Sequence, residues 1–416
     1  NQQFKVQGLE KTSLNEVSKI NLTYLTTLVD KNLTANNKTI LIKEQEQAVL
    51  IGIDQGKGLW SIEDSLEELK QLAKTAGAEV VAKTYQKRDK PDSALFLGKG
   101  KIQEITLLVQ EHNANLVICD DELTPAQYKN LEDELDVKVM DRTLIILDIF
   151  AGRAKTAEGK IQVELAQLRY RSARLVGLRE SLSRLGGGIG TRGPGEKKLE
   201  TDRRLIRTRI SALKAELAQV EKHRELIRGK RSRGNLKTAA IVGYTNAGKS
   251  TLLNTLTGAG ILAEDKLFAT LDPTTRVLEL KDGQQILLTD TVGFIRKLPH
   301  HLVEAFKSTL EEAKYADYII HVVDASNPQA EIQMHIVYET LKELGALGKK
   351  TITLFNKQDR VSGESFRDLR ADHTLKISAR TGEGLEEFKQ LLANQRSLPR
   401  NFVRDVVMKA PGRDIM

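Results

Sequence analysis

Two kinds of hydrophobic pattern divide the chain. After Gln47, short apolar runs alternate with stretches of helical spacing, so strands are predicted at 48–53, 79–82, 116–119 and 137–140, and helices at 61–78, 101–113 and 125–135. Such alternation is typical of a small parallel α/β domain, because each strand needs a crossover before its parallel neighbour. We place this domain at residues 46–152.

Between residues 153 and 235 the strand pattern gives way to a helical one. Apolar residues recur at three- and four-residue spacing in two long stretches, at Ile161, Leu165, Leu168, Leu175 and Leu182, and then at Ile206, Ile210, Leu213, Leu217, Val220 and Ile227. A glycine-rich segment at 186–195 separates them. Two amphipathic helices bury both stripes when they pack antiparallel, so a long helical hairpin is predicted.

The same patterns place the rest of the chain. Residues 236–397 return to alternating strands and helices and form the last predicted domain. Residues 1–45 are polar without a clear period, and we treat them as an N-terminal extension; residues 398–416 form a short tail. The predicted fold class is therefore α/β, with a helical hairpin between two α/β domains.

Composition favours a folded, soluble protein. Of 416 residues, 40% are hydrophobic and 29% are charged, which is ordinary for globular chains. No apolar run approaches the ~18–20 residues that cross a bilayer, so no membrane partner is expected. The single cysteine, Cys119, excludes an intrachain disulfide, and no Cys/His spacing resembles a zinc site. We expect a protein of the reducing cytoplasm.

Basic charge is concentrated in the predicted hairpin. Residues 153–233 contain 22 basic and 9 acidic residues, a net charge of +13, whereas the whole chain carries +8 and the remainder therefore −5. A local excess of this size is expected of a segment that contacts phosphate backbones, although a solvated helical face can carry similar charge.

The glycine-rich segment has the letters of a dinucleotide-binding fingerprint at 188–193. That fingerprint requires a preceding strand, whereas this segment follows a predicted helix, so we reject a dinucleotide site. We expect a mobile loop, and the basic residues around it can meet phosphates: Arg184, Arg192, Lys197 and Lys198. A plain flexible linker is the alternative.

A phosphate-binding loop follows the strand predicted at 238–242. The sequence is Gly243-Tyr244-Thr245-Asn246-Ala247-Gly248-Lys249-Ser250 before a helix from Thr251, which is G-x-x-x-x-G-K-[ST] in its strand–loop–helix context. The glycines let backbone N–H groups converge on the β-phosphate at a helix N-terminus. Lys249 supplies positive charge to the β- and γ-phosphates, and the Ser250 hydroxyl is expected to bind Mg²⁺.

Two later motifs select guanine. Asn356, Lys357 and Asp359 form N-K-x-D after the strand predicted at 351–355. Asp359 can accept hydrogen bonds from guanine N1–H and the 2-amino group, a pattern that adenine does not offer, while the Lys357 stem lies along the base. Ser378-Ala379-Arg380 matches the fifth G motif, in which a backbone N–H meets guanine O6. GTP and GDP are the expected ligands.

Two segments are expected to sense the γ-phosphate. Asp290-Thr291-Val292-Gly293 is a D-x-x-G motif, in which Asp290 would hold Mg²⁺ through its water and the Gly293 N–H would meet the γ-phosphate. The other switch lies between 262 and 276, where Thr270 is favoured as the Mg²⁺-binding hydroxyl and Thr274 and Thr275 are alternatives. Lys249, Thr270 and Gly293 are the candidate catalytic residues.

Phe294 follows Gly293, where Ras-like proteins carry the glutamine that orients water. A phenyl ring cannot polarise water, so slow intrinsic hydrolysis is predicted, with acceleration by a partner or an ion. Asn246 resembles the asparagine of potassium-stimulated G proteins, and we hypothesise K⁺ beside the phosphates. The alternative is an asparagine that only hydrogen-bonds the loop.

With these motifs in place, the chain resembles an HflX-type GTPase of the Obg–HflX group of translational G proteins. The resemblance covers about residues 46–397 and is carried by Gly98-Lys99-Gly100-Lys101, by 141–151, 162–168 and 193–204, and by Phe268-Ala269-Thr270-Leu271-Asp272-Pro273-Thr274. It implies a P-loop G domain preceded by a small α/β domain and a helical hairpin.

The resemblance also implies a partner, the large ribosomal subunit. The α/β domain and the hairpin would reach its ribosomal RNA, and GTP would govern the separation of stalled ribosomes under stress. Arg203, Arg204 and Arg207 join the candidate RNA contacts, unless they pair with Glu200 and Asp202. Off the ribosome we expect a monomer.

Two other functions remain open from the sequence. One is a nucleotide-gated RNA-binding or ribosome assembly factor with negligible turnover. The other is a GTPase that serves RNA modification through a catalytic partner.

Overall fold

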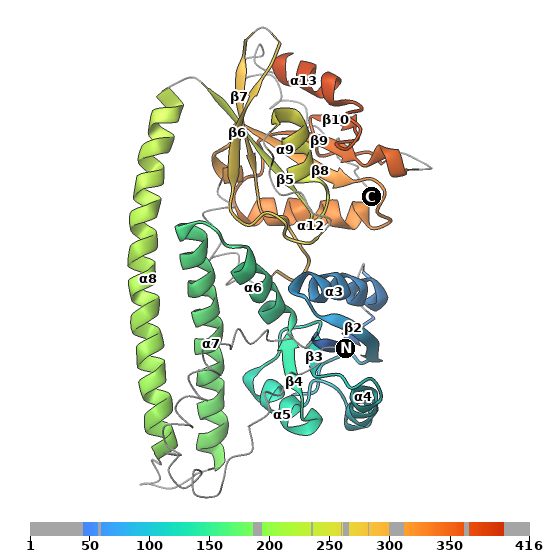
Figure 1. Ribbon diagram of the computed structural model, residues 1–416, viewed down its shortest axis with the longest axis vertical. Coiled ribbons are helices and arrows are strands. Elements are labelled where there is room, and N and C mark those ends of the chain that lie inside the picture. The colour runs from blue at the N-terminus through green and yellow to red at the C-terminus, as the bar shows by residue number, and fades with distance from the viewer. Residues whose placement is uncertain are drawn as a thin grey trace, which may run out of the picture. The chain divides into compact units, whose positions relative to one another are not determined.

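The computed structural model describes residues 45–56, 60–185, 194–233, 236–258, 260, 266–281, 283–298, 312–361 and 366–394 (Figure 1). The predicted N-terminal extension, most of the glycine-rich segment and the C-terminal tail lie outside this set. By its internal contacts, the chain from Glu46 onward is one compact unit. No helix among the described residues is long and apolar enough to cross a membrane.

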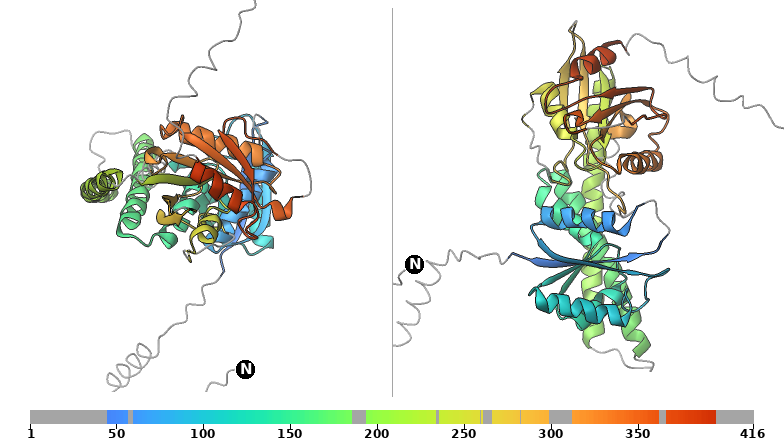
Figure 2. Two further views of the ribbon diagram at one scale, coloured as in Figure 1. Left: turned by 90° about the horizontal axis from the view of Figure 1, so that it is seen from above. Right: turned by 90° about the vertical axis from the view of Figure 1, so that its right-hand side faces the viewer.

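Four parallel strands form the N-terminal sheet, in the order β2-β1-β3-β4. The strands are β1 Gln47–Asp54, β2 Glu79–Lys87, β3 Leu116–Cys119 and β4 Lys138–Asp141. The helices are α3 Ile62–Ala76, α4 Lys99–Glu111, α5 Pro125–Leu135 and α6 Arg142–Arg153. Alternate strand residues face opposite sides, so Leu50 packs with α3 and α6, and Ile51 packs with α4 and α5. Helices cover both faces of this sheet (Figure 2).

Local signals explain where these helices begin. Ser61 caps α3 by accepting the Asp64 N–H at 3.0 Å, and Thr124 forms a capping box with Gln127 at the start of α5. The sequence pattern does not predict α6. Its apolar run at 144–147 has no helical period, because the helix is buried on several sides.

The predicted hairpin is present as α7 (Ala157–Leu185) and α8 (Pro194–Arg233) (Figure 1). Of the predicted α8 stripe, Leu213 is fully buried and Ile206, Ile210, Leu217 and Val220 are half-buried, while the side chain of Ile227 lies outside the described residues. A second buried face of α7, which the stripe does not predict, carries Val163, Ala166 and Tyr170. The Tyr170 hydroxyl donates to Asp141 at 2.7 Å, and α7 packs against α5 and α6 of the N-terminal domain as well as against α8.

A six-stranded sheet follows the hairpin, in the order β10-β9-β8-β5-β7-β6, with only β6 antiparallel to its neighbour among these strands. The strands are β5 Lys237–Gly243, β6 Thr274–Glu279, β7 Gln285–Asp290, β8 Tyr318–Asp324, β9 Lys350–Asn356 and β10 His373–Lys376. The described helices are α9 Lys249–Thr257, α12 Ala330–Glu343, the short 3₁₀ turn η1 Gln358–Arg360 and α13 Leu385–Asn394. This order confirms the predicted α/β class.

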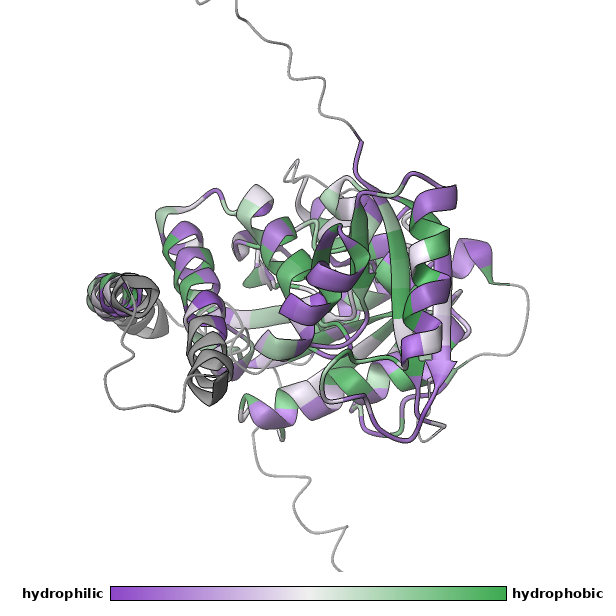
Figure 3. Ribbon diagram, turned by 90° about the horizontal axis from the view of Figure 1, so that it is seen from below, coloured by the Kyte–Doolittle hydropathy of each residue, from purple (hydrophilic) through white to green (hydrophobic). Residues whose placement is uncertain are grey.

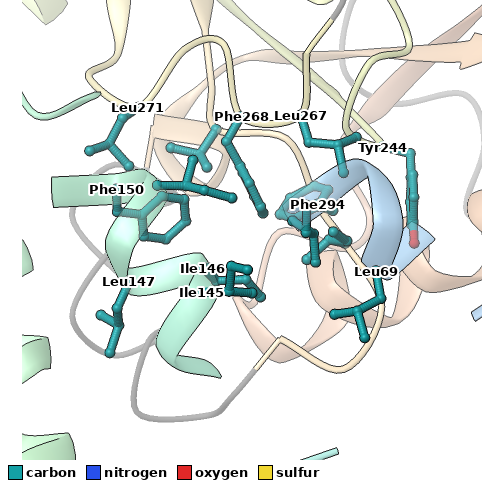
Figure 4. Packing of buried hydrophobic residues seen from close by; sticks show 14 of the residues in the cluster. Leu69, Ile145, Ile146, Leu147, Phe150, Tyr244, Leu267, Phe268, Leu271 and Phe294 are labelled. Carbon is teal, nitrogen blue, oxygen red and sulfur yellow. The ribbon is translucent and has the colours of Figure 1, made fainter. Parts of the chain in front are cut away.

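One hydrophobic cluster joins the two sheets. It combines residues of α3 and α6, such as Leu69 and Phe150, with residues beside the phosphate-binding loop, such as Phe268 and Phe294 (Figure 4). In Figure 3, hydrophobic colour follows the strands, while hydrophobic and hydrophilic residues alternate along the helices around them. The loops next to the phosphate site therefore have part of their core in the N-terminal domain.

A buried ion-pair network lies beside this cluster. The Arg142 side chain is 2% exposed, and its guanidinium donates to Glu68 and, at 2.9 Å, to Asp120. Lys297, which follows the D-x-x-G segment, also donates to Asp120, at 2.6 Å. Burial raises the pKa of Asp120, while Lys297 opposes that shift.

Arg142→Ala is expected to destabilise the fold strongly. The change leaves the Glu68 carboxylate buried without its counter-charge, which costs about 3–5 kcal/mol in comparable networks. Arg209→Ala is the control, because Arg209 and Glu164 form a solvent-exposed pair, which contributes little to stability. Urea denaturation of both variants measures the difference, and equal destabilisation would contradict this account.

Candidate nucleotide-binding site

The phosphate-binding loop joins β5 to α9, and two of its glycines are required by close approach. Gly243 has φ +156°, and a Cβ there would lie 2.2 Å from the Val322 carbonyl oxygen. Gly248 has φ +98°, and its Cβ would lie 2.3 Å from Asn356 Nδ2. Only glycine fits both positions without displacing the neighbouring strands. The backbone then enters α9 with its N–H groups at the helix start.

The Asn356 side chain links its own N-K-x-D motif by hydrogen bonds to the phosphate-binding loop and to the Ser-Ala-Arg motif. Its Nδ2 donates to the Ala247 carbonyl at 2.9 Å, and its Oδ1 accepts the Ala379 N–H at 2.8 Å. The side chain is buried at the end of β9, so both bonds are shielded from water. The Ala379 N–H, which lies in the predicted O6-reading motif, is thus engaged with Asn356 in this structure.

The other residues predicted to bind guanine lie around Asn356. Asp359 accepts the Ser378 hydroxyl at 2.6 Å, a bond that lowers the pKa of Asp359 and keeps it a carboxylate acceptor. Lys357 adopts φ +64° and pairs with Asp324 at 2.7 Å. Arg380 is exposed beside them. The structure therefore brings the N-K-x-D and Ser-Ala-Arg motifs into one wall.

Three oxygen donors predicted to hold Mg²⁺ converge. The Ser250 hydroxyl lies 2.7 Å from the Thr270 hydroxyl and donates to Asp290 Oδ2 at 2.7 Å. Asp290 is fully buried, and its Oδ1 has no hydrogen-bond partner among the described residues. Thr274 and Thr275, the alternatives to Thr270, belong to β6 and pair with β7 instead. The geometry thus favours Thr270.

This donor set fits a hard cation. Mg²⁺ prefers oxygen ligands and is often held by one or two carboxylates and hydroxyls together with phosphate oxygens. Two hydroxyls and a buried carboxylate with an unused oxygen provide that chemistry. Burial raises the pKa of Asp290, and a cation beside it would favour the charged carboxylate.

The D-x-x-G segment lies directly against the phosphate-binding loop. A Cβ on Gly293 would be 2.9 Å from Lys249 Nζ and 2.9 Å from the Thr245 backbone. The Phe294 N–H donates to the Gly243 carbonyl at 3.1 Å, and the Thr245 N–H donates to the Phe294 carbonyl at 2.8 Å. Movement of one loop therefore requires movement of the other.

Lys249 is buried between these segments. Its Nζ donates to the Gly243 and Tyr244 carbonyls at 3.2 and 2.8 Å. Desolvation lowers the pKa of Lys249 to about 8, partly offset by Asp290. An anionic phosphate at this position would favour the charged ammonium. The surrounding cleft is lined by residues of the predicted set, including Thr245, Asn246, Gly248, Ser250, Thr251, Thr270, Thr291 and Gly293.

Comparisons with known proteins agree with this geometry. Three protein families match consecutive parts of the chain: "GTP-binding GTPase N-terminal" at residues 63–151, "GTP-binding GTPase Middle Region" at 153–231 and "50S ribosome-binding GTPase" at 238–357. GTPase HflX of Lacrimispora saccharolytica is 65% identical over 355 residues, 85% of this chain and 84% of that protein. The chain belongs to the HflX family of GTPases.

More distant relatives are also similar. GTPase HflX of Escherichia coli is 44% identical over 358 residues, 85% of this chain and 83% of that protein. A solved GTP-binding protein of Sulfolobus solfataricus, in complex with GDP, is 26% identical and covers 85% of this chain and 100% of that chain, with a TM-score of 0.46. The predicted family resemblance is confirmed, and the chain is a GTP-binding GTPase of the HflX family.

Tyr244 belongs to the predicted nucleotide set, but its side chain points elsewhere. The ring is 4% exposed and lies in the cluster shared with the N-terminal domain (Figure 4). Its hydroxyl donates to Glu68 and accepts the Arg296 N–H at 3.0 Å. Only its backbone borders the phosphate loop. The sequence motif could not reveal this, because that position of the P-loop pattern accepts any residue.

Phe294 lies in the same cluster and is 1% exposed. Its ring packs toward α3 and α6 (Figure 4), so it anchors the D-x-x-G segment rather than facing the phosphate cleft. Asn246, the predicted K⁺ residue, lines the cleft with φ +60°.

The candidate RNA-contact residues lie on the hairpin. Arg204 and Arg207 are exposed on α8, and Arg203 is half-buried. Within the described part of the chain, no ion pair joins Arg204 or Arg207 to an acidic residue. Arg192 lies outside the described residues, as do the side chains of Arg184, Lys197 and Lys198.

Asn356→Ala is expected to weaken GDP and GTP binding by about ten- to a hundredfold. The variant removes two buried hydrogen bonds that hold the loop and the guanine wall together, at about 0.5–1.5 kcal/mol each. Gln358→Ala is the control, because the Gln358 side-chain amide donates to the Phe355 carbonyl and, among the described residues, to neither of the two segments that Asn356 joins. Titration with a fluorescent guanine nucleotide measures both, and normal binding by Asn356→Ala would contradict the assigned role.

Proposed function

We propose that this HflX-family protein binds and hydrolyses GTP with Mg²⁺ and associates with the large ribosomal subunit. The observation that carries the proposal is the convergence of Ser250, Thr270 and Asp290 beside the phosphate-binding loop. The match to a "50S ribosome-binding GTPase" family supports the ribosomal partner. The basic hairpin supports contacts to ribosomal RNA, because its charge excess is local.

Each residue at the site has a proposed task. Ser250, Thr270 and Asp290 would hold Mg²⁺, which neutralises charge on the β- and γ-phosphates when bound. Lys249, which lines the same cleft, supplies a second positive charge. The Gly293 N–H would meet the γ-phosphate, since no side chain separates this backbone from the phosphate loop. Asp359 would read guanine, with its carboxylate oriented by Ser378.

Turnover by the protein alone should be slow. The Phe294 side chain offers no hydrogen-bonding group and is buried away from the cleft, so it cannot orient the attacking water. An activating group from the large subunit, or K⁺ held by Asn246, would supply what is missing. The biological outcome we propose is dissociation or rescue of stalled ribosomes under stress, by a protein that is monomeric in the cytoplasm when off the ribosome.

Steady-state GTP hydrolysis tests the central proposal. In KCl buffer we expect purified large ribosomal subunits to raise kcat by an order of magnitude or more, because they would complete a site that lacks a water-orienting group. Replacing KCl with NaCl should lower the rate, and Asn246→Ala should remove that difference. Lys249→Ala is the inactive control, since it removes the phosphate-binding charge.

The other outcomes distinguish the alternatives. No stimulation, together with intact GTP-dependent co-sedimentation with the subunit, would favour a nucleotide-gated binding or assembly factor. Absence of both effects would contradict the ribosomal partner. Equal rates in KCl and NaCl would contradict the K⁺ site alone.

Neutralising Arg203, Arg204 and Arg207 together should weaken binding to large subunits. Removing one phosphate-binding cation reduces the magnitude of the slope of log K against log salt by about 0.7–0.9, so removing three should reduce it by about 2–3. Sedimentation at several salt concentrations measures the slope. A control variant neutralises three exposed lysines of the G domain, Lys281, Lys342 and Lys376, and should leave the slope unchanged. Identical behaviour of the two triple variants would contradict RNA binding through α8.

A further inference from the structure

Asp272 links the predicted first switch to the helical hairpin. It lies two residues after Thr270, and its carboxylate accepts the backbone N–H groups of Lys155 and Thr156 at 2.9 and 3.1 Å. It also accepts the Thr156 hydroxyl. Thr156 Oγ1 in turn accepts the Gly159 N–H at 2.9 Å, as the capping residue at the start of α7. The switch therefore completes the N-terminal cap of a hairpin helix.

This contact depends on a glycine in the helix. A Cβ on Gly159 would lie 2.3 Å from Asp272 Oδ1, so any larger residue would displace the carboxylate. Glycine within a helix is otherwise unfavourable relative to alanine. The close approach of Asp272 gives a physical reason for glycine at this position. A carboxylate at a helix N-terminus is also favoured by the helix dipole.

Apolar contacts also anchor residues 268–272, the segment that contains Thr270 and Asp272. Phe268 and Leu271 are each 2% exposed, and the Phe268 ring meets Phe150 of α6 edge-on at 4.8 Å between centroids (Figure 4). Phe268 has φ +54°, a conformation that a phenylalanine adopts only when its surroundings impose it. Between these anchors, the Thr270 hydroxyl is 2.7 Å from Ser250.

We propose that Asp272 is a positioning residue, which holds Thr270 at the cation and γ-phosphate site by binding the start of α7. The hairpin and the first switch then move together, so a change at either one alters the other by the same coupling free energy. This inference rests on the proposed Mg²⁺–GTP site. It adds that the contact between Asp272 and the start of α7 determines how strongly the site prefers GTP to GDP.

Binding of a non-hydrolysable GTP analogue and of GDP, each with Mg²⁺, tests the proposal. Asp272→Asn removes the charge and replaces one acceptor oxygen by a donor, so we expect the analogue to bind about tenfold more weakly and GDP to be unaffected. Asp148→Asn is the matched control, because Asp148 is an exposed aspartate on α6. Equal weakening of both nucleotides would show a merely structural role and overturn the proposal, as would no change.

Gly159→Ala provides a second test that a folding defect cannot imitate. Alanine should favour the helix while displacing Asp272, so we expect unchanged or higher thermal stability together with the same selective weakening of analogue binding. Gly152→Ala is the control, because a Cβ on Gly152 in α6 meets no atom within 4 Å. Normal analogue binding by Gly159→Ala would overturn the proposal.

Thr270→Ala separates failure of this inference from failure of the proposed site. If Thr270→Ala also weakens the analogue selectively, and adding Asp272→Asn causes no further weakening, the two residues act in one pathway. A selective effect of Thr270→Ala without one from Asp272→Asn would overturn only the role of Asp272. No effect of Thr270→Ala would contradict the Mg²⁺ assignment itself.

Discussion

The shared hydrophobic cluster is the constraint on which the rest of the structure depends. Phe294 and Phe268, which flank the phosphate cleft, are buried against α3 and α6 of the N-terminal domain. Burial of an aromatic side chain stabilises by about 1.5–3 kcal/mol, so detaching either loop from its partner is costly. The loops cannot rearrange without disturbing the packing between the two sheets.

Polar contacts around this cluster favour one arrangement of the packed elements over others. The Tyr244 hydroxyl joins Glu68 to the backbone at Arg296, and Arg142 neutralises the same carboxylate. The Asp272 contacts to the start of α7 are exposed to solvent, whereas those of Glu68 are buried. Buried charged contacts of this kind are specific to one arrangement, because misplacing a partner leaves a desolvated charge. A nucleotide that moves the loops would therefore alter a defined set of contacts in the N-terminal domain.

Most of the residues that line the candidate nucleotide cleft could be named from the sequence, although Lys266, Phe268 and Ala269 were not among them. The motifs combine glycines for close backbone approach with a few polar residues at fixed spacing, and these depend on local geometry. The sequence favoured Thr270 and kept Thr274 and Thr275 as alternatives. The structure supports Thr270, because the other two belong to β6 and pair with β7. The stripe predicted for α8 is confirmed at Leu213. Like the motifs, helical periodicity depends on residues that are close together in the sequence.

Long-range features could not be predicted. Helix α6 was missed because a helix buried on several sides has no polar face to reveal its period. The second buried face of α7, at Ala166 and Tyr170, was missed for the same reason, because this part of α7 is also buried on more than one side. The roles of Tyr244 and Asp272 depend on partners more than a hundred positions away, Glu68 and Thr156. No spacing rule connects such pairs, and only the fold brings them together.

The central claim is that the nucleotide state reaches the hairpin through the first switch. Amide hydrogen exchange at Lys155 and Thr156 tests it most directly, because both N–H groups donate to Asp272. Saturation with Mg²⁺ and a non-hydrolysable GTP analogue should slow exchange at these two amides by about tenfold or more relative to GDP, which corresponds to about 1.4 kcal/mol of added protection. Equal exchange rates in the two states would contradict the account.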